Sequence, residues 1–349
     1  MGGGAQFGRH FSVISGVPSL VVLLLPLGLI AAGAPMNAPS IESFVGALNN
    51  LGIADASVIA VGALIIGLVL YPLQFGFTQI LEGYWGVSPP ARTAMARSTR
   101  IHLRRWICLL RLDKESDAEL TNVNSLIVRN QNAQSVKSSA LHRTRCANLE
   151  ARLLERRISS VFKKQEAIRA ASRFPRSSED FMPTKLGNML RRHERLAGAP
   201  FGLESIGTTP YLAQIAGEEE RAYLDDSRTS LDLSVRMVLV WTISAATTAT
   251  LLWRHGAWLV VPLACLVLAY ATYLGTIASA AQYGTALIVV TALSRQRLYE
   301  SLGLQLPATS DQEIERNVKL RDVLAGFPAR LTYQWPSAED RIRSAEPNN

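Results

Sequence analysis

The chain has 349 residues, of which 48% are hydrophobic, 7% aromatic and 18% charged, and its mean hydropathy is +0.14. Soluble domains carry about 25% charged residues, so this chain is poor in charge and rich in aliphatic side chains. This composition excludes collagen-like, disordered and disulfide-scaffold proteins, and the apolar residues lie in long blocks. We therefore predict an all-α integral membrane protein.

Four apolar segments are each long enough to cross a hydrocarbon core, which takes roughly 20 helical residues. After an N-terminal tail at 1–12, they occupy 13–36, 56–81, 235–253 and 258–278. The first two are joined by a loop at 37–55, and only residues 254–257 separate the last two, which predicts a tight helical hairpin. A cleaved signal peptide is the alternative for the first segment, because small residues follow its apolar run.

The distribution of cations predicts the orientation in the membrane. The loop at 37–55 has no Lys or Arg, whereas residues 91–240 hold 26 Lys and Arg against 17 Asp and Glu. By the positive-inside rule, both termini and the region 82–234 are cytoplasmic, and the loop at 37–55 is extracytoplasmic. Thirty arginines against six lysines are typical of a GC-rich bacterial genome, so we expect a bacterial inner or plasma membrane.

The cytoplasmic region at 82–234 has a helical pattern. Its first part is rich in basic residues and its second part is rich in acidic ones. Its segment from Arg97 to Arg111 is amphipathic, which predicts a helix lying on anionic lipid headgroups. The alternative is a core helix with a solvated basic face. Nucleic acid is a less favoured partner, since no nucleic-acid-binding motif accompanies the charge. The predicted lipid-binding residues are Arg97, Arg100, Arg104, Arg105, Trp106 and Arg111.

Further helices follow along the chain. An amphipathic pattern from Gln134 to Ser172 predicts a helix that packs on others or self-associates, which favours a homo-oligomer or a membrane partner protein. The apolar face of the segment after Gly217 predicts a helix that continues into the third span. The fourth span is expected to extend to about Leu302 in the cytoplasmic tail at 279–349. In that tail Ser310 and Glu313 predict a capping box, and the last residues are expected to be disordered.

The spans contain small and polar residues but no ionisable side chain near any centre, which argues against a transporter. Helix packing is the favoured role of the small and polar positions, and a pore is the alternative. They are Pro72, Gln74, Gln79, Thr247, Thr248 and Gly275. Known catalytic, cofactor and metal-site motifs are lacking, so we predict no enzyme, cofactor or metal.

Three stretches carry a resemblance to a known group: PTKLGNMLRRHERLAGAPFGLESI, YLDDSRTSLDLSV and AQYGTALIVVTALSRQRLYESLGLQLP. They resemble a group of bacterial four-span membrane proteins without an assigned activity, and the resemblance covers most of the chain from about residue 180. It implies an N-terminal pair of spans, an amphipathic cytoplasmic domain and a C-terminal pair of spans.

Together these features favour a membrane-anchored scaffold, sensor or interaction protein that acts through its cytoplasmic helices. The first alternative is an oligomeric channel for ions or small solutes, with Gln74 and Thr247 near its path. The second is a membrane-bound enzyme with a site that no motif marks.

Overall fold

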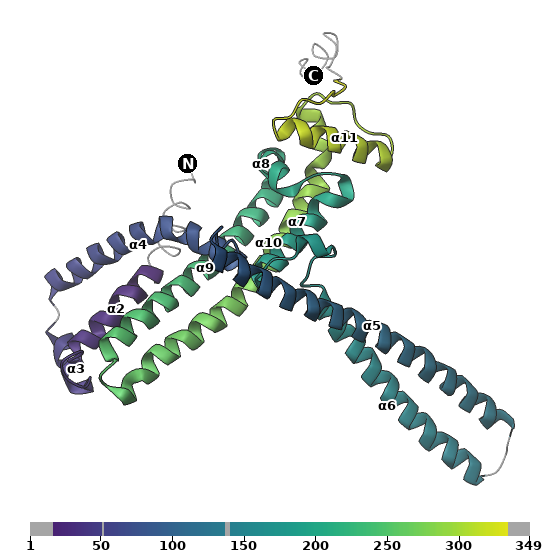
Figure 1. Cartoon of the computed structure of the whole chain (residues 1–349), viewed down its shortest axis with the longest axis horizontal. Helices are drawn as coiled ribbons and strands as arrows, with labels where there is room; N and C mark the ends of the chain where they lie inside the picture. Colours follow the sequence, from purple (N-terminus) through teal and green to yellow (C-terminus); the bar gives the residue numbers. More distant parts are fainter. Residues whose placement is uncertain (1–16, 51, 137–139, 334–349) are drawn as a thin grey trace, which may run out of the picture. The chain divides into compact units, whose positions relative to one another are not determined.

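The computed structural model describes residues 17–50, 52–136 and 140–333, and the described residues form helices and no strand (Figure 1). One isolated β-bridge joins Leu304 and Tyr333. The chain divides into two compact units. Unit 1 comprises Met1–Tyr84 together with His193–Asn349, and unit 2 comprises Trp85–Arg192.

Unit 1 is built around α9 (Glu218–Leu252), which packs against α2 (Val17–Ala31), α4 (Ile53–Glu82) and α10 (Val260–Ser301). In Figure 1 α2, α9 and α10 lie side by side. Half of the most apolar stretch of α9 is buried inside the unit, against 11% for α4. α9 is therefore the central helix, and α4 keeps most of its apolar surface on the outside.

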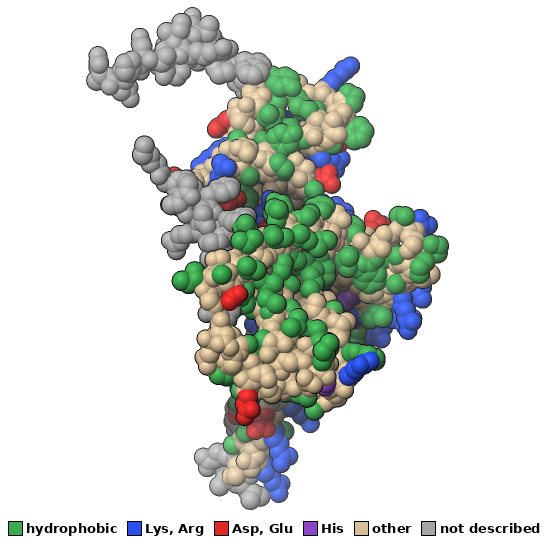
Figure 2. Space-filling view, turned by 90° about the vertical axis from the view of Figure 1, so that its left-hand side faces the viewer, with side chains coloured by type: hydrophobic (Ala, Val, Ile, Leu, Met, Phe, Trp, Pro, Cys, Tyr) green, Lys and Arg blue, Asp and Glu red, His purple; other side chains and the backbone are tan. Residues whose placement is uncertain are grey.

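Among the described residues, three helices are long and apolar enough to cross a membrane: α4, α9, and α10 together with the short helix η4 (Gly256–Leu259). These helices indicate a multi-pass membrane protein. The first predicted span, at 13–36, corresponds to the shorter apolar helix α2, and residues 13–16 lie outside the described part. Figure 2 shows apolar side chains gathered on the face of the molecule that it presents, with few charged ones among them.

The loop after α2 and the turn between α9 and α10 lie at the same end of unit 1. The His255 Nε2 atom is 3.0 Å from the Pro35 carbonyl oxygen. The loop contains α3 (Ile41–Asn49), which begins after Ser40, and the Ser40 hydroxyl accepts a hydrogen bond from the Ser43 amide. The loop and the hairpin turn therefore meet at one end of unit 1.

The opposite end of unit 1 is a helical cap over the extended ends of α9 and α10, both of which continue as predicted. Its helices are η3 (Ala199–Phe201), α8 (Ser205–Ile215) and α11 (Ser310–Leu324). The capping box of α11 was predicted one residue too late. Thr309 is the N-cap, and its hydroxyl accepts from the Gln312 amide while Gln312 Oε1 accepts from the Ala308 amide.

Unit 2 is a long antiparallel helical hairpin of α5 (Pro89–Val136) and α6 (Ala140–Ala171). A short helix η2 (Ser178–Asp180) and the first part of α7 (Lys185–Gly198) complete it. Two predicted helices differ here in extent. The amphipathic helix predicted at 97–111 is part of a 48-residue helix, and the helix predicted from Gln134 to Ser172 corresponds mainly to α6, with its first residues at the end of α5. The reason for the first difference is a periodic seam that continues along α5 far beyond Arg111.

Candidate functional site

The two helices of the hairpin meet along a seam with alternating steps of three and four residues, which is the spacing of a coiled coil. On α6 one step is seven residues, from Leu153 to Ser160, because Arg157 between them is exposed. We call this set the inner seam, and its members on both helices are buried or half-buried. On α5 they are His102, Trp106, Leu109, Asp113, Ser116, Leu120, Val123, Ile127 and Asn130. On α6 they are Cys146, Glu150, Leu153, Ser160, Lys164 and Ala167.

Polar and small side chains dominate the inner seam. The Asn130 amide donates to the Cys146 carbonyl at 3.0 Å, and Lys164 pairs with Asp117 at 2.5 Å. Ser116 and Ser160 are 2% and 0% exposed. Since the hydrophobic effect scales with the apolar area removed from water, this seam stabilises the hairpin less than a seam of leucines would.

Large apolar side chains lie on the outside of the same hairpin. On α6, Leu154, Ile158 and Phe162 are 42%, 55% and 66% exposed. Further members of this exposed set are Ile101, Ile107, Leu110, Leu112, Leu126, Val128, Leu149 and Ile168. A contiguous exposed apolar surface on a helix marks a site of interaction with protein or membrane. The hairpin is therefore the main candidate interaction element of the described chain.

An aromatic cluster closes the end of the hairpin next to α7. The ring of Phe181 packs edge-on against Trp106 at 5.5 Å and stacks on Phe174 at 5.8 Å, and His102 lies 6.0 Å from Phe174. Burial lowers the pKa of His102, and a hydrogen bond to the Pro183 carbonyl opposes this shift only in part. Burial in the cluster therefore disfavours the charged form of this histidine.

The predicted lipid-binding residues fall into two groups. The arginines Arg97, Arg100, Arg104, Arg105 and Arg111 are all exposed. Trp106 belongs to the aromatic cluster instead, so its ring is engaged with Phe181. The structure thus keeps the arginines together as an open cationic surface and separates the tryptophan from them.

In unit 1 the buried polar feature is a clamp between α4 and α9. The Gln74 side-chain oxygen accepts a hydrogen bond from Arg236 Nε at 2.7 Å and a second from Arg236 Nη2. The Gln74 amide nitrogen donates to the Asp232 carbonyl at 3.2 Å. Arg236 is only 4% exposed. An arginine at this depth needs such acceptors, because an unpaired buried charge is costly.

Sequence analysis missed Arg236, because it stands at the start of the predicted third span rather than near its centre. The signal was a spacing: Arg228, Asp232 and Arg236 recur every four residues and so share one face of α9. Near this face, the charges of Glu82, Glu194, Arg228 and Asp232 all act on Tyr283 of α10. The polar face of α9 thus continues from the clamp toward the helical cap.

The other predicted pore or packing residues do not join this clamp. Pro72 lies within α4, which continues through it, and both Pro72 and Gln79 are exposed. The Thr247 and Thr248 hydroxyls each donate to the Ser244 carbonyl of their own helix, at 3.1 and 2.7 Å. Gly275 lies on an exposed face, where an added Cβ would meet no atom within 4 Å, so it does not serve packing within the chain.

The close approach of helices that was expected at Gly275 occurs at Gly284. A Cβ at Gly284 would lie 2.2 Å from Cγ of His193, so only glycine fits against this imidazole. Gly284 follows the buried residues Thr276 and Ala280 at steps of four. The packing face of α10 is therefore rotated by one residue from the row that contains Gly275.

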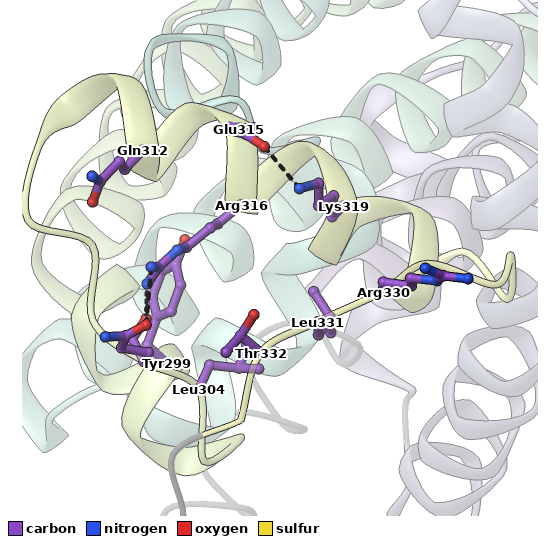
Figure 3. A pocket seen from close by; sticks show the side chains of 10 residues that line it. Tyr299, Leu304, Gln312, Glu315, Arg316, Lys319, Arg330, Leu331 and Thr332 are labelled. Atoms are coloured by element: carbon purple, nitrogen blue, oxygen red, sulfur yellow. Dashed lines mark hydrogen bonds and ion pairs between the residues drawn. The ribbon is translucent and has the colours of Figure 1, made fainter.

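A cavity of about 260 Å³ opens in the helical cap between α10, α11 and the segment at 330–332 (Figure 3). The Arg316 guanidinium donates to the Gln305 carbonyl at 2.5 Å, and Lys319 pairs with Glu315 at 2.8 Å. The Tyr299 hydroxyl donates to Asn317 at 2.6 Å. These polar groups bind one another, and within the described residues no three His, Cys, Asp or Glu side chains are placed to hold a metal ion.

Comparison of the chain with protein-family models, with curated proteins and with solved structures finds no match to any of them.

Proposed function

We propose that this chain is a membrane-anchored interaction protein whose cytoplasmic hairpin, α5 and α6, binds protein partners as a scaffold or sensor. In this proposal α2 is the first of four spans in a bacterial inner or plasma membrane, and both termini are cytoplasmic. Three facts support it. α2 is uncharged, α2 packs on α4 and α9, and the cations are concentrated after the second span. The proposal assigns no catalytic role to the chain.

The observation that carries the proposal is the apolar outer surface of the hairpin. Its inner seam mixes polar and small residues with large apolar ones such as Leu109 and Val123, yet its outer surface still holds exposed leucine, isoleucine, valine and phenylalanine. A hairpin that served only as a spacer would place these side chains inward, because that arrangement removes more apolar area from water. An outward apolar surface is useful to a protein that binds others through it.

The test is quantitative co-purification of the tagged full-length protein from its native membranes in mild detergent. Replacing Ile158 by Glu puts a charge on the outer surface and is expected to deplete associated proteins by about tenfold, the effect of roughly 1.4 kcal/mol. The matched control is Ser159→Glu, an exposed neighbour without an apolar side chain. An unchanged set of associated proteins in the Ile158→Glu sample would contradict the proposal.

A further inference from the structure

A second heptad seam lies on α6 beside the inner one. Its members follow inner-seam residues by one position, except that Ile158 follows the exposed Arg157, and their steps alternate between four and three. We call this set the outer seam, and it consists of Ala147, Ala151, Leu154, Ile158, Val161, Gln165 and Ile168. A single helix with two adjacent heptad seams has the pattern of a helix that packs against two neighbours at once.

Within the described part of unit 2, only one of those neighbours is present. α5 covers the inner seam, while Leu154, Ile158 and Ile168 of the outer seam are 42%, 55% and 48% exposed. The outer seam spans three heptads without a charged member. It is therefore a continuous coiled-coil surface whose second helix comes from outside the hairpin.

We propose that the missing neighbour is α6 of a second copy of this chain, packed antiparallel along the outer seam from Leu154 to Ile168 with Phe162 at the two-fold axis. This inference deepens the proposed function, on which it rests, by naming the partner. The charges at the edges of the seam select the second copy and its direction.

One edge of the outer seam is occupied and the other is open. The first edge consists of Glu150, Arg157 and Lys164. Glu150 and Lys164 are inner-seam residues beside α5, and Lys164 is bonded there to Asp117, whereas Arg157 is exposed. Glu155, Phe162 and Arg169 form the open edge, and all three are exposed. Two hairpins can therefore meet closely only when their open edges face each other.

The open edge is complementary to itself only when the helices run antiparallel. Glu155 and Arg169 are each seven residues from Phe162, so an antiparallel pair centred on Phe162 places Glu155 opposite Arg169 of the second copy, twice. A parallel pair would instead face Glu155 with Glu150 of the second copy, and Arg169 with Lys164. Like charges across a coiled-coil interface disfavour that arrangement, and opposite charges favour the first.

The experiment is site-directed cross-linking of the full-length protein in membranes. Two copies with different tags are co-expressed, one carrying Glu155→Cys and the other Arg169→Cys. Both also carry Cys108→Ser, because Cys108 is exposed, while Cys146 and Cys265 are buried. With a short bis-maleimide reagent, which reacts with one cysteine thiol at each end, the mixed 155–169 product is expected to exceed the control pair by about tenfold, since binding raises the effective concentration of the two thiols.

The control pair is Arg156→Cys with Arg169→Cys, because Arg156 is exposed on the side of α6 opposite the outer seam. Predominant 155–155 and 169–169 products would overturn the proposal in favour of a parallel pair, and equal yields from test and control would overturn any pairing along the seam. Failure here is separable from failure of the proposed function. Suppose that the Ile158→Glu variant loses an associated protein of another kind and that no 155–169 product forms. The chain then remains an interaction protein, but a second copy of it is not the partner.

Discussion

The Gln74 amide and the Arg236 guanidinium join α4 to α9 through two hydrogen bonds to one oxygen atom. α4 is otherwise mostly exposed, and its packing on α9 and α2 involves few buried side chains, such as Leu70 at 4% exposure. The clamp consequently fixes which face of α4 meets the central helix. It also explains how an arginine is tolerated inside an apolar bundle.

Replacing Gln74 by Leu is expected to lower the stability of unit 1 by about 3 kcal/mol, because it leaves the Arg236 guanidinium buried without that acceptor. Thermal unfolding of the detergent-solubilised protein measures this loss. Gln79→Leu removes an exposed amide from the same helix and should change little. In the double variant Gln74→Leu/Arg236→Met most of the stability should return. The coupling would be disproved if the loss of stability in the double variant equalled the sum of the losses in the two single variants.

Gly284→Ala is expected to destabilise the contact between α10 and His193, because the new methyl group would overlap the imidazole ring. Overpacking of this kind costs about 1–3 kcal/mol. Gly275→Ala is the matched control in the same helix, since its methyl group meets no atom within 4 Å. It should leave the melting temperature unchanged or raise it, as alanine is the better helix former. Equal effects of the two substitutions would refute the assigned packing face of α10.

The aromatic cluster of unit 2 predicts a loss of stability in mild acid. His102 has a lowered pKa in the folded state, so below the ordinary value of 6.5 the unfolded chain binds more protons than the folded one. Stability contributed by neutral His102 is therefore complete above that value and declines as the pH falls toward the folded pKa.

Hydrogen exchange of α5 amides at pH 7.5 and at pH 5, corrected for the intrinsic rate, measures this loss. His102→Phe keeps a ring beside Phe174 without a titrating group, so its protection should depend less on pH. The hypothesis is rejected when the parent protein and the His102→Phe variant respond to acid identically.

The exposed arginines of α5 remain predicted lipid-binding residues. With a polarity-sensitive label on Cys108, which is exposed among them, contact with lipid can be followed by quenching from spin-labelled lipids in proteoliposomes. We expect stronger quenching in anionic than in zwitterionic vesicles, and loss of the difference in Arg100→Glu/Arg104→Glu/Arg105→Glu, since each cation near such a surface contributes about 1 kcal/mol. If the quenching is the same in anionic and zwitterionic vesicles and is unchanged by the substitutions, these arginines do not bind lipid headgroups.

The sequence by itself determined the class of this protein. Uncharged apolar stretches cannot fold as solvent-exposed segments, so α4, α9 and α10 were recognisable from hydropathy and length alone. The continuity of α9 from Gly217 was also predictable, because the helical period of Leu224, Leu231 and Val238 does not change at the span boundary. Local patterns of this kind depend only on neighbours along the chain.

Only the tertiary structure decided which polar and small residues meet. Gln74 had a polar side chain in an apolar span, but its partner Arg236 is 162 residues away, and no local pattern connects the two. Gly275 and Gly284 are equivalent by composition, and the position of His193 alone makes the second one indispensable. Likewise, the sequence pattern of α6 indicated an amphipathic helix. Only the packing of α5 on the inner seam showed that the adjacent outer seam is exposed. Contacts between distant segments depend on how helices rotate about their axes when they pack, and that rotation is settled by the assembled core.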